Sequence, residues 1–262
     1  MQQVRAWQGP AVLSYGFRPF FFLAGLWAAC AMILWLLTLT GHTVLATAFD
    51  PFTWHAHEFV FGYVTAVIAG FLLTAVPNWT GRLPVVGWPL AGLVALWLAG
   101  RAAVAFSAGL PALAVALLDL SFSTALLFFL GREILIGRNW RNLPVLGLLS
   151  VITVANGLFH WQAAHGAVTG DNIGLRLALA GEIMLIALIG GRIVPSFTRN
   201  WLVQRKASSL PAPAGPFDHV SLLITGAALI SFAAVPEAGV TALLCAVAGA
   251  ANLLRLSRWQ GQ

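Results

Sequence analysis

Long apolar runs constrain the fold of this chain more than any other feature of its sequence. About eight runs of roughly 17 to 25 mainly apolar residues follow one another, and each can cross a hydrocarbon core about 30 Å thick as an α-helix. Because lipid offers no hydrogen-bond partner, the backbone of each run must satisfy its own polar groups, as a helix does. The predicted spans lie near residues 20–39, 56–76, 88–106, 111–130, 143–161, 173–195, 219–235 and 238–256.

The composition agrees with a protein that lies largely within a bilayer. Of the 262 residues, 60% are hydrophobic and only 8% are charged, which is outside the range of soluble domains. The sequence therefore predicts an all-α, polytopic transmembrane helical bundle, in contact with the lipid bilayer, with residues 1–262 as a single integral membrane domain. The first run is expected to be a retained span, since no small-residue cleavage site follows it. Residues 196–218, rich in Pro, Ser and Ala, are expected to form a flexible connection.

The distribution of basic residues predicts the orientation of the spans. In an arrangement of about eight spans, all 14 lysines and arginines except Arg101 and Arg176 fall on one side of the membrane. Basic residues concentrate in cytoplasmic loops, so both termini are expected to be cytoplasmic. The same bias accounts for the net charge of +6, which favours a topology signal over binding of nucleic acid.

The stretch D-P-F-T-W-H-A-H-E at residues 50–58 places three side chains that can bind metal at the start of the second span. Asp followed by Pro is a favourable helix start, so the second helix is expected to begin near Pro51. At about 100° per residue, His55 and His57 point in nearly opposite directions, whereas His55 and Glu58 share a face. The stretch can therefore serve two different sites.

Counting along each span from its expected cytoplasmic end groups the intramembrane polar residues into two levels. His57 lies at roughly 28 Å and His160 at roughly 26 Å, with Arg176 near the same level. A second level, at roughly 17 to 20 Å, holds one residue from each of four spans: Arg101, Asp119, Asn156 and Glu182. Charged groups inside a bilayer are costly unless they are paired or hydrated, so these residues are expected to face a shared inward cavity.

Three histidines are the expected ligands of a metal or a haem: His55, His57 and His160. Neutral imidazole is a common ligand, and bis-histidine ligation of a b-type haem requires two helices that face each other at one depth. Six other residues are expected to support such ligands or to handle protons: Glu58, Arg101, Asp119, Asn156, Arg176 and Glu182. For Arg101 with Asp119, a purely structural ion pair is an equal alternative.

Several long motifs carry a family resemblance. They are L-S-Y-G-F-R-P-F-F at 13–21, D-P-F-T-W-H-A-H-E at 50–58, G-F-L-L-T-A-V-P-N-W-T-G-R at 70–82, R-N-W-R-N-L-P-V at 138–145, N-G-L-F-H at 156–160 and G-G-R-I-V-P-S-F-T-R-N-W at 190–201. In this order they resemble the NnrS family, which comprises bacterial inner-membrane proteins that contain haem and copper and are linked to nitric oxide metabolism and nitrosative stress.

The resemblance implies a cofactor and a set of ligands. It places His55, His57 and His160 in the histidine motifs of the family, as ligands of haem b or copper, without assigning either cofactor to a particular histidine. It also implies that relatives usually continue through further spans with a later histidine, so that a ligand from such a segment would complete the site.

The leading functional hypothesis is a haem-binding, and also copper-binding, membrane protein that handles nitric oxide or iron-nitrosyl species near the periplasmic side. Haem iron with an exchangeable ligand binds nitric oxide, and Glu58 or Glu182 could manage protons during turnover. One alternative is a transporter or metal-handling permease that uses Asp119, Glu182 and Arg101. Another is a membrane subunit without a cofactor. The sequence leaves open whether turnover occurs and which protein donates electrons.

Overall fold

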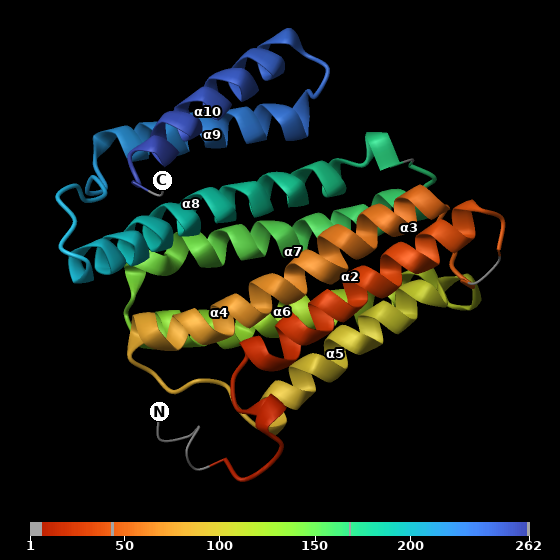
Figure 1. Ribbon diagram of the computed structural model, residues 1–262. Coiled ribbons are helices and arrows are strands. Elements are labelled where there is room, and N and C mark those ends of the chain that lie inside the picture. Colours follow the sequence, from red (N-terminus) through yellow and green to blue (C-terminus); the bar gives the residue numbers. More distant parts are fainter. Residues whose placement is uncertain (1–6, 43–44, 168, 261–262) are drawn as a thin grey trace. The chain divides into compact units, whose positions relative to one another are not determined.

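The computed structural model describes residues 7–42, 45–167 and 169–260, and every secondary-structure element in these ranges is a helix (Figure 1). Eight of the helices are long and apolar enough to cross a membrane. The prediction of an all-α, polytopic membrane protein is therefore confirmed. The orientation with both termini in the cytoplasm stays a prediction.

The helices follow the predicted spans closely, with short 3-10 turns between some of them. In chain order they are η1 (Ala11–Leu13), α2 (Phe17–Leu39), α3 (Pro51–His57), η2 (Glu58–Val64), α4 (Thr65–Thr80), α5 (Trp88–Ala105), η3 (Ser107–Gly109), α6 (Ala112–Ile136), η4 (Trp140–Asn142), α7 (Leu143–Ala164), η5 (Thr169–Asp171), α8 (Ile173–Gln204), α9 (Pro216–Ala234) and α10 (Gly239–Ser257).

The start of the second span follows from its first two residues. The Asp50 side chain accepts hydrogen bonds from the backbone N–H groups of Phe52 and Thr53, at 3.0 and 3.1 Å, and Pro51 is the first helical residue. Such a cap satisfies donors that have no partner within the helix. The predicted helix start at Pro51 is confirmed.

The middle of this span departs from regular α-helix. Residues Glu58–Val64 form a π-helix, η2, between α3 and α4, so the second span is a continuous helical rod from Pro51 to Thr80. π-Helical turns are rare overall, but many of those that occur lie at functional sites. One carbonyl of this segment, that of Gly62, accepts a 3.0 Å hydrogen bond from the Trp97 indole of α5.

The sixth span is longer than the sequence predicted. Helix α8 passes through Pro195 and ends only at Gln204, so the expectation of a flexible connection from residue 196 is wrong for its first nine residues. A proline removes one backbone hydrogen bond, and long membrane helices tolerate that loss where neighbouring groups compensate.

Contacts among the residues divide the chain into two compact units, Met1–Ala178 and Leu179–Gln262. In the first unit α5 packs on α6, α2 on α4, and α6 on α7. In the second, α9 packs on α10. Helix α8 begins in the first unit and continues in the second. The predicted single domain stays a prediction. The polar residues that concern function lie mainly in the first unit.

Candidate metal centre

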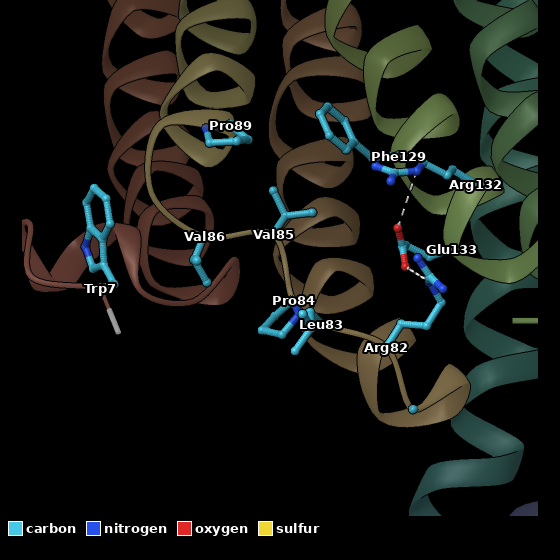
Figure 2. Close-up of a pocket in the computed structure, with 11 residues that line it drawn as sticks. Trp7, Arg82, Leu83, Pro84, Val85, Val86, Pro89, Phe129, Arg132 and Glu133 are labelled. Atoms are coloured by element: carbon cyan, nitrogen blue, oxygen red, sulfur yellow. Dashed lines mark hydrogen bonds and ion pairs between the residues drawn. The ribbon is translucent and has the colours of Figure 1, made fainter. Parts of the chain in front are cut away.

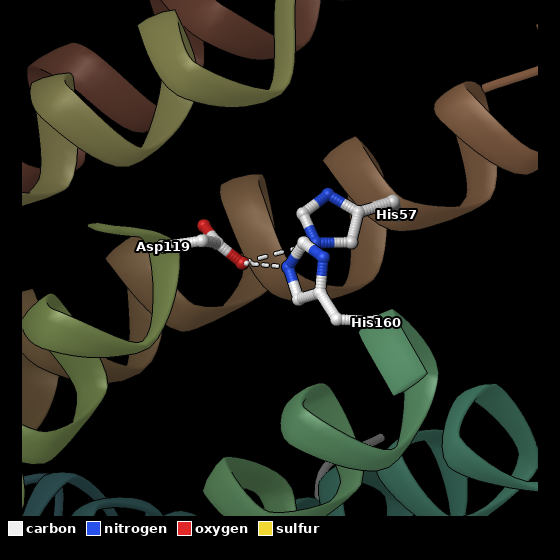
Figure 3. A group of neighbouring side chains, drawn as sticks. All are labelled: His57, Asp119 and His160. Carbon is white, nitrogen blue, oxygen red and sulfur yellow. Dashed lines mark hydrogen bonds and ion pairs between the residues drawn. The ribbon is translucent and has the colours of Figure 1, made fainter. Parts of the chain in front are cut away.

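Three side chains from three helices converge inside the first unit. His57 ends α3, Asp119 lies in the first third of α6 and His160 lies near the end of α7 (Figure 3). One ligand atom from each lies within 4.8 Å of the others, and all three side chains are buried. Two imidazoles and a carboxylate brought together in this way form a donor set suited to a metal ion.

One oxygen atom, Oδ2 of Asp119, is the centre of this group. The Nε2 atoms of His57 and His160 each lie 3.0 Å from it, as the dashed lines in Figure 3 show. The amide of Asn156, one helical turn before His160, donates to the same oxygen at 2.8 Å. The carboxylate therefore fixes the distance between the two imidazoles.

A second layer of contacts closes a ring of charged groups around His57. Arg101 pairs with the other oxygen of Asp119 through Nη2, and its Nη1 donates to Oε2 of Glu58 at 2.7 Å. Oε1 of Glu58 lies 3.3 Å from Nδ1 of His57. Each member of the ring is therefore held by two others, which orients the imidazole of His57 from both of its nitrogens.

Two glycines leave room for this ring. A Cβ atom on Gly62 of η2 would lie 2.4 Å from the Arg101 guanidinium, and one on Gly100 would lie 2.9 Å from Oδ1 of Asp119. Contacts this short are not tolerated between real Cβ atoms and their neighbours. The absence of side chains at these two positions is what lets Arg101 reach both carboxylates.

Aromatic side chains enclose the polar ring. The Trp27 indole of α2 donates to Oε2 of Glu58 at 2.7 Å. The rings of Phe159, Phe61 and Phe49 lie 4.9, 5.2 and 6.1 Å from that of His57. This apolar wall keeps the electrostatic interactions of the ring strong, because it excludes water.

The cluster carries a net negative charge in its simplest ionisation state. Glu58 and Asp119 contribute two negative charges and Arg101 one positive charge, while neutral imidazoles contribute none. A buried charge without compensation is costly. One further positive charge, from a proton on His57 or from a bound cation, makes the cluster neutral.

The structure does not bring His55 into this group. Its ring stacks on Trp35 of α2, with centroids 4.0 Å apart, and packs on Phe59 at 4.5 Å. Its Nδ1 atom is buried and has no hydrogen-bond partner among the described residues. Of the three predicted ligands, His57 and His160 therefore lie together and His55 lies apart.

Two other predicted residues also lie outside the cluster. Arg176 donates to the carbonyl of Gly170 at 2.7 Å, near the start of α8. Glu182 belongs to the second unit, where it is buried and its Oε1 atom has no partner within the described ranges.

The expectation of two separate levels is wrong for the residues of the first unit. His57 and His160 contact Asp119 directly, and Asn156 and Arg101 bond to the same carboxylate. The count along the spans assumed that their cytoplasmic ends share one height, but α4 and α6 continue several residues past the assumed ends. Long side chains bridge the remaining distance.

Sequence reasoning missed four contributors to this site: Trp27, Gly62, Gly100 and the π-helical segment. The two glycines lie inside predicted spans, where an isolated glycine usually has a packing reason, and this signal was present in the sequence. Nothing in the local sequence distinguishes Trp27 from the other tryptophans in the spans.

The helices and the buried His/Asp group define a multi-pass membrane protein with a possible metal site. The family model described as NnrS protein matches residues 11–262, nearly the whole chain, and the chain belongs to the NnrS family. The resemblance seen in the motifs is thus confirmed. Neither the curated proteins nor the solved structures contain a match to this chain.

Proposed function

We propose that this chain binds one copper ion through His57, Asp119 and His160 and handles nitric oxide or iron-nitrosyl species in the bacterial inner membrane. The observation that carries the proposal is the convergence of two imidazole nitrogens on one carboxylate oxygen in a fully buried site. Family membership supports the link to nitric oxide and nitrosative stress. Whether the protein turns nitric oxide over or only binds it is outside this proposal.

The ligand atoms are spaced suitably for a single ion. Ligands about 2.0 Å from a metal in a tetrahedral site lie roughly 3.3 Å from one another. Both imidazole nitrogens are 3.0 Å from Oδ2 of Asp119, and the three ligand atoms all lie within 4.8 Å. Small side-chain movements therefore suffice to bind an ion. Nitrogen and carboxylate ligands suit copper, which also has the highest affinity for such donors among the common divalent ions.

Charge further supports a cation at this position. With neutral imidazoles the cluster of Glu58, Arg101 and Asp119 has one excess negative charge, so it is neutral with a monovalent ion and carries one positive charge with a divalent ion. The nitrogen and carboxylate donors suit copper(II), so the loaded cluster carries one net positive charge. In this arrangement Glu58 accepts a hydrogen bond from Nδ1–H of His57, which leaves Nε2 as the ligand atom.

A small cavity leads to His160. It has a volume of about 100 Å³ and is lined mainly by apolar groups, among them Phe49, Leu110 and Val115. Its size suits a diatomic molecule such as nitric oxide, which is small and weakly polar. A copper ion held by His57, Asp119 and His160 would supply the binding site for such a molecule.

Haem b does not fit between His57 and His160 as they lie in this structure. Both Nε2 atoms point at one oxygen of Asp119, and the two imidazole rings have centroids only 5.1 Å apart. The cavity of about 100 Å³ beside His160 is also far smaller than the 300 Å³ or more of typical cofactor sites. Haem b remains a prediction from the family resemblance, with His55 as the histidine that the cluster does not use.

The transporter hypothesis has less support. Arg101 and Asp119, two of the three residues that it needs, neutralise each other within a closed ring of hydrogen bonds. A transport path requires polar groups that are free to bind a passing substrate.

The proposal is tested by metal analysis of protein purified after expression with copper and haem. We expect about one copper per chain, and loss of at least 100-fold in copper affinity for His160→Ala, because a ligand is removed. His165→Ala is the matched control, since this histidine lies five residues later, is exposed and, within the described part of the chain, has one hydrogen bond, to the Trp161 carbonyl at 2.7 Å. Copper-free wild-type protein, or equal copper binding by both variants, would contradict the proposal.

A further inference from the structure

A large pocket lies at the end of the first unit opposite the start of α3. It has a volume of about 650 Å³ and lies between the loop that joins α4 to α5 and the last turns of α6 (Figure 2). The hydrophobic side chains of Trp7, Val85, Pro89 and Phe129 form much of its wall. A second pocket, of about 300 Å³, adjoins it and shares Arg82. Neither pocket touches the proposed metal centre.

Three charged side chains stand on one side of the larger pocket. Arg82 forms an ion pair with Oε2 of Glu133, and Nε of Arg132 lies 4.0 Å from the other oxygen of the same carboxylate, as Figure 2 shows. The net charge of this group is therefore +1. The Arg132 side chain is 54% exposed, and that of Glu133 only 14%, so Arg132 is the arginine that a ligand can reach first.

Tryptophans place this end of the unit at the level of lipid headgroups. Trp88 begins α5 and is 77% exposed, while Trp140 precedes α7 and is 58% exposed. Exposed tryptophans concentrate at the membrane–water interface, where their rings suit the headgroup region. The pocket thus has an apolar part and a positively charged part at the depth where a phospholipid has the same two parts.

We propose that this pocket binds a phospholipid with a net charge of −1, whose one charged group is the phosphodiester. Arg132 and Arg82 donate hydrogen bonds to the phosphate oxygens, and the apolar wall contacts the glycerol and the first methylenes of an acyl chain. Arginine pairs well with phosphate because its planar fork donates two parallel hydrogen bonds. In the orientation predicted from the basic residues, the lipid comes from the cytoplasmic leaflet.

A free inorganic anion would use only part of this pocket. It would satisfy the arginines but leave the apolar wall in contact with water, which is unfavourable in proportion to the area exposed. The shared chemistry of both ligands is a phosphate group, so the test needs one arm for each.

The direct test is native mass spectrometry of the full chain released from detergent that contains phosphatidylglycerol and phosphatidylethanolamine in equal amounts. We expect wild-type protein to retain phosphatidylglycerol preferentially. Arg132→Gln should reduce this retention about fivefold, as expected for one basic residue near an anionic lipid. Glu133→Gln should increase retention, because it removes the competing carboxylate and frees Arg82.

Arg138→Gln is the matched control. Arg138 is exposed just beyond the same end of α6, and it does not line the pocket. Its substitution removes the same charge as that of Arg132. Equal loss in Arg138→Gln and Arg132→Gln would overturn the proposal, because it would indicate a general surface effect. So would equal retention of the two lipids by wild-type protein, or displacement of phosphatidylglycerol by millimolar inorganic phosphate, which would indicate a site for free anions.

Discussion

Each of the two units contains a buried aspartate that pairs with a buried arginine, yet the surroundings of the two pairs differ. In the first unit, Asp119 pairs with Arg101 and also accepts contacts from two imidazoles and an amide. In the second, Asp218 near the start of α9 pairs with Arg255 of α10 at 2.9 Å and accepts the backbone N–H of Gly215 at 3.0 Å.

The contacts of the Asp218–Arg255 pair hold helices together. The bond from Gly215 to Asp218 closes a capping box at the helix start, and Arg255 also donates to the Ala187 carbonyl of α8 at 2.9 Å. These contacts join three helices, and among the described residues no group of three metal-binding side chains forms around Asp218. A buried ion pair in a membrane protein therefore does not by itself indicate a site. The convergence of several metal-binding atoms on the pair does.

The largest difference between the two pairs should appear on removal of the aspartate. Asp119→Ala leaves both histidines without their common acceptor, so we expect complete loss of metal binding and a decrease of about 3 to 5 kcal/mol in the free energy of unfolding. Asp218→Ala should decrease it by about 2 kcal/mol, through the lost cap and ion pair, with metal binding unchanged.

Thermal unfolding in detergent and metal analysis on the same samples measure both effects. Loss of metal in Asp218→Ala, or retention of metal in Asp119→Ala, would remove the distinction between a ligand-binding pair and a structural pair.

A smaller effect is expected from the carboxylate that orients His57. Glu58→Gln keeps the shape of the side chain but removes its charge and weakens the acceptor for Nδ1 of His57, so copper affinity should decrease about 10- to 100-fold. Competition titration with a copper(II) chelator measures this change. Glu237→Gln, which removes a charge from an exposed position between α9 and α10, should leave the affinity unchanged. Equal affinities of wild-type protein and Glu58→Gln would show that Glu58 has no role in the site.

The smallest effect concerns Asp50, a third aspartate, which caps α3 and has no arginine partner among the described residues. Partial burial raises the pKa of its carboxyl, but hydrogen bonds from the Thr53 hydroxyl and from the backbone N–H groups of Thr53 and Phe52 outweigh this and hold the pKa below the ordinary value of 3.8. A lowered pKa in the folded state means that the ionised carboxylate stabilises the fold at pH values above the ordinary pKa. This contribution is lost as the pH falls through the lowered pKa.

Asp50→Ala should therefore destabilise the protein by about 1 kcal/mol at neutral pH. Asp50→Asn should retain most of the cap and lose only its acid dependence, because asparagine is an equally good cap. Unfolding at neutral pH separates the two variants, and unfolding measured from pH 7 down to pH 3 separates Asp50→Asn from wild-type protein. Identical acid dependence in wild-type protein and Asp50→Asn would exclude a contribution from this carboxyl.

The sequence was sufficient to predict the helices but not the ring of polar contacts. Apolar length defines a membrane span almost by itself, and the Asp50-Pro51 start carries its own local signal, so both were predictable. The contacts of Asp119 depend on helix tilt, on the relative heights of helix ends and on side-chain reach. None of these is encoded in the residues near Asp119.

The separation of His55 from His57 was predictable only in part. Their spacing of two residues on a helix indicated that they face different ways, and in the structure His55 packs on Trp35 while His57 contacts Asp119. Which of the two would meet His160 could not be read from the spacing. That choice depends on the rotation of α3 about its axis, and the sequence gives no reference for this rotation.

In the structure, the π-helical segment Glu58–Val64 sets the rotation of α3 relative to α4. A π-type hydrogen bond encloses one residue more than an α-type bond, and one residue corresponds to about 100° of rotation in an α-helix. If this segment were regular α-helix with one residue fewer, α3 would be turned by about that angle relative to α4, and His57 would face a different neighbour. The extra residue thus changes the rotation of α3 relative to α4. As a result α4 packs in the bundle while His57, at the end of α3, still faces Asp119.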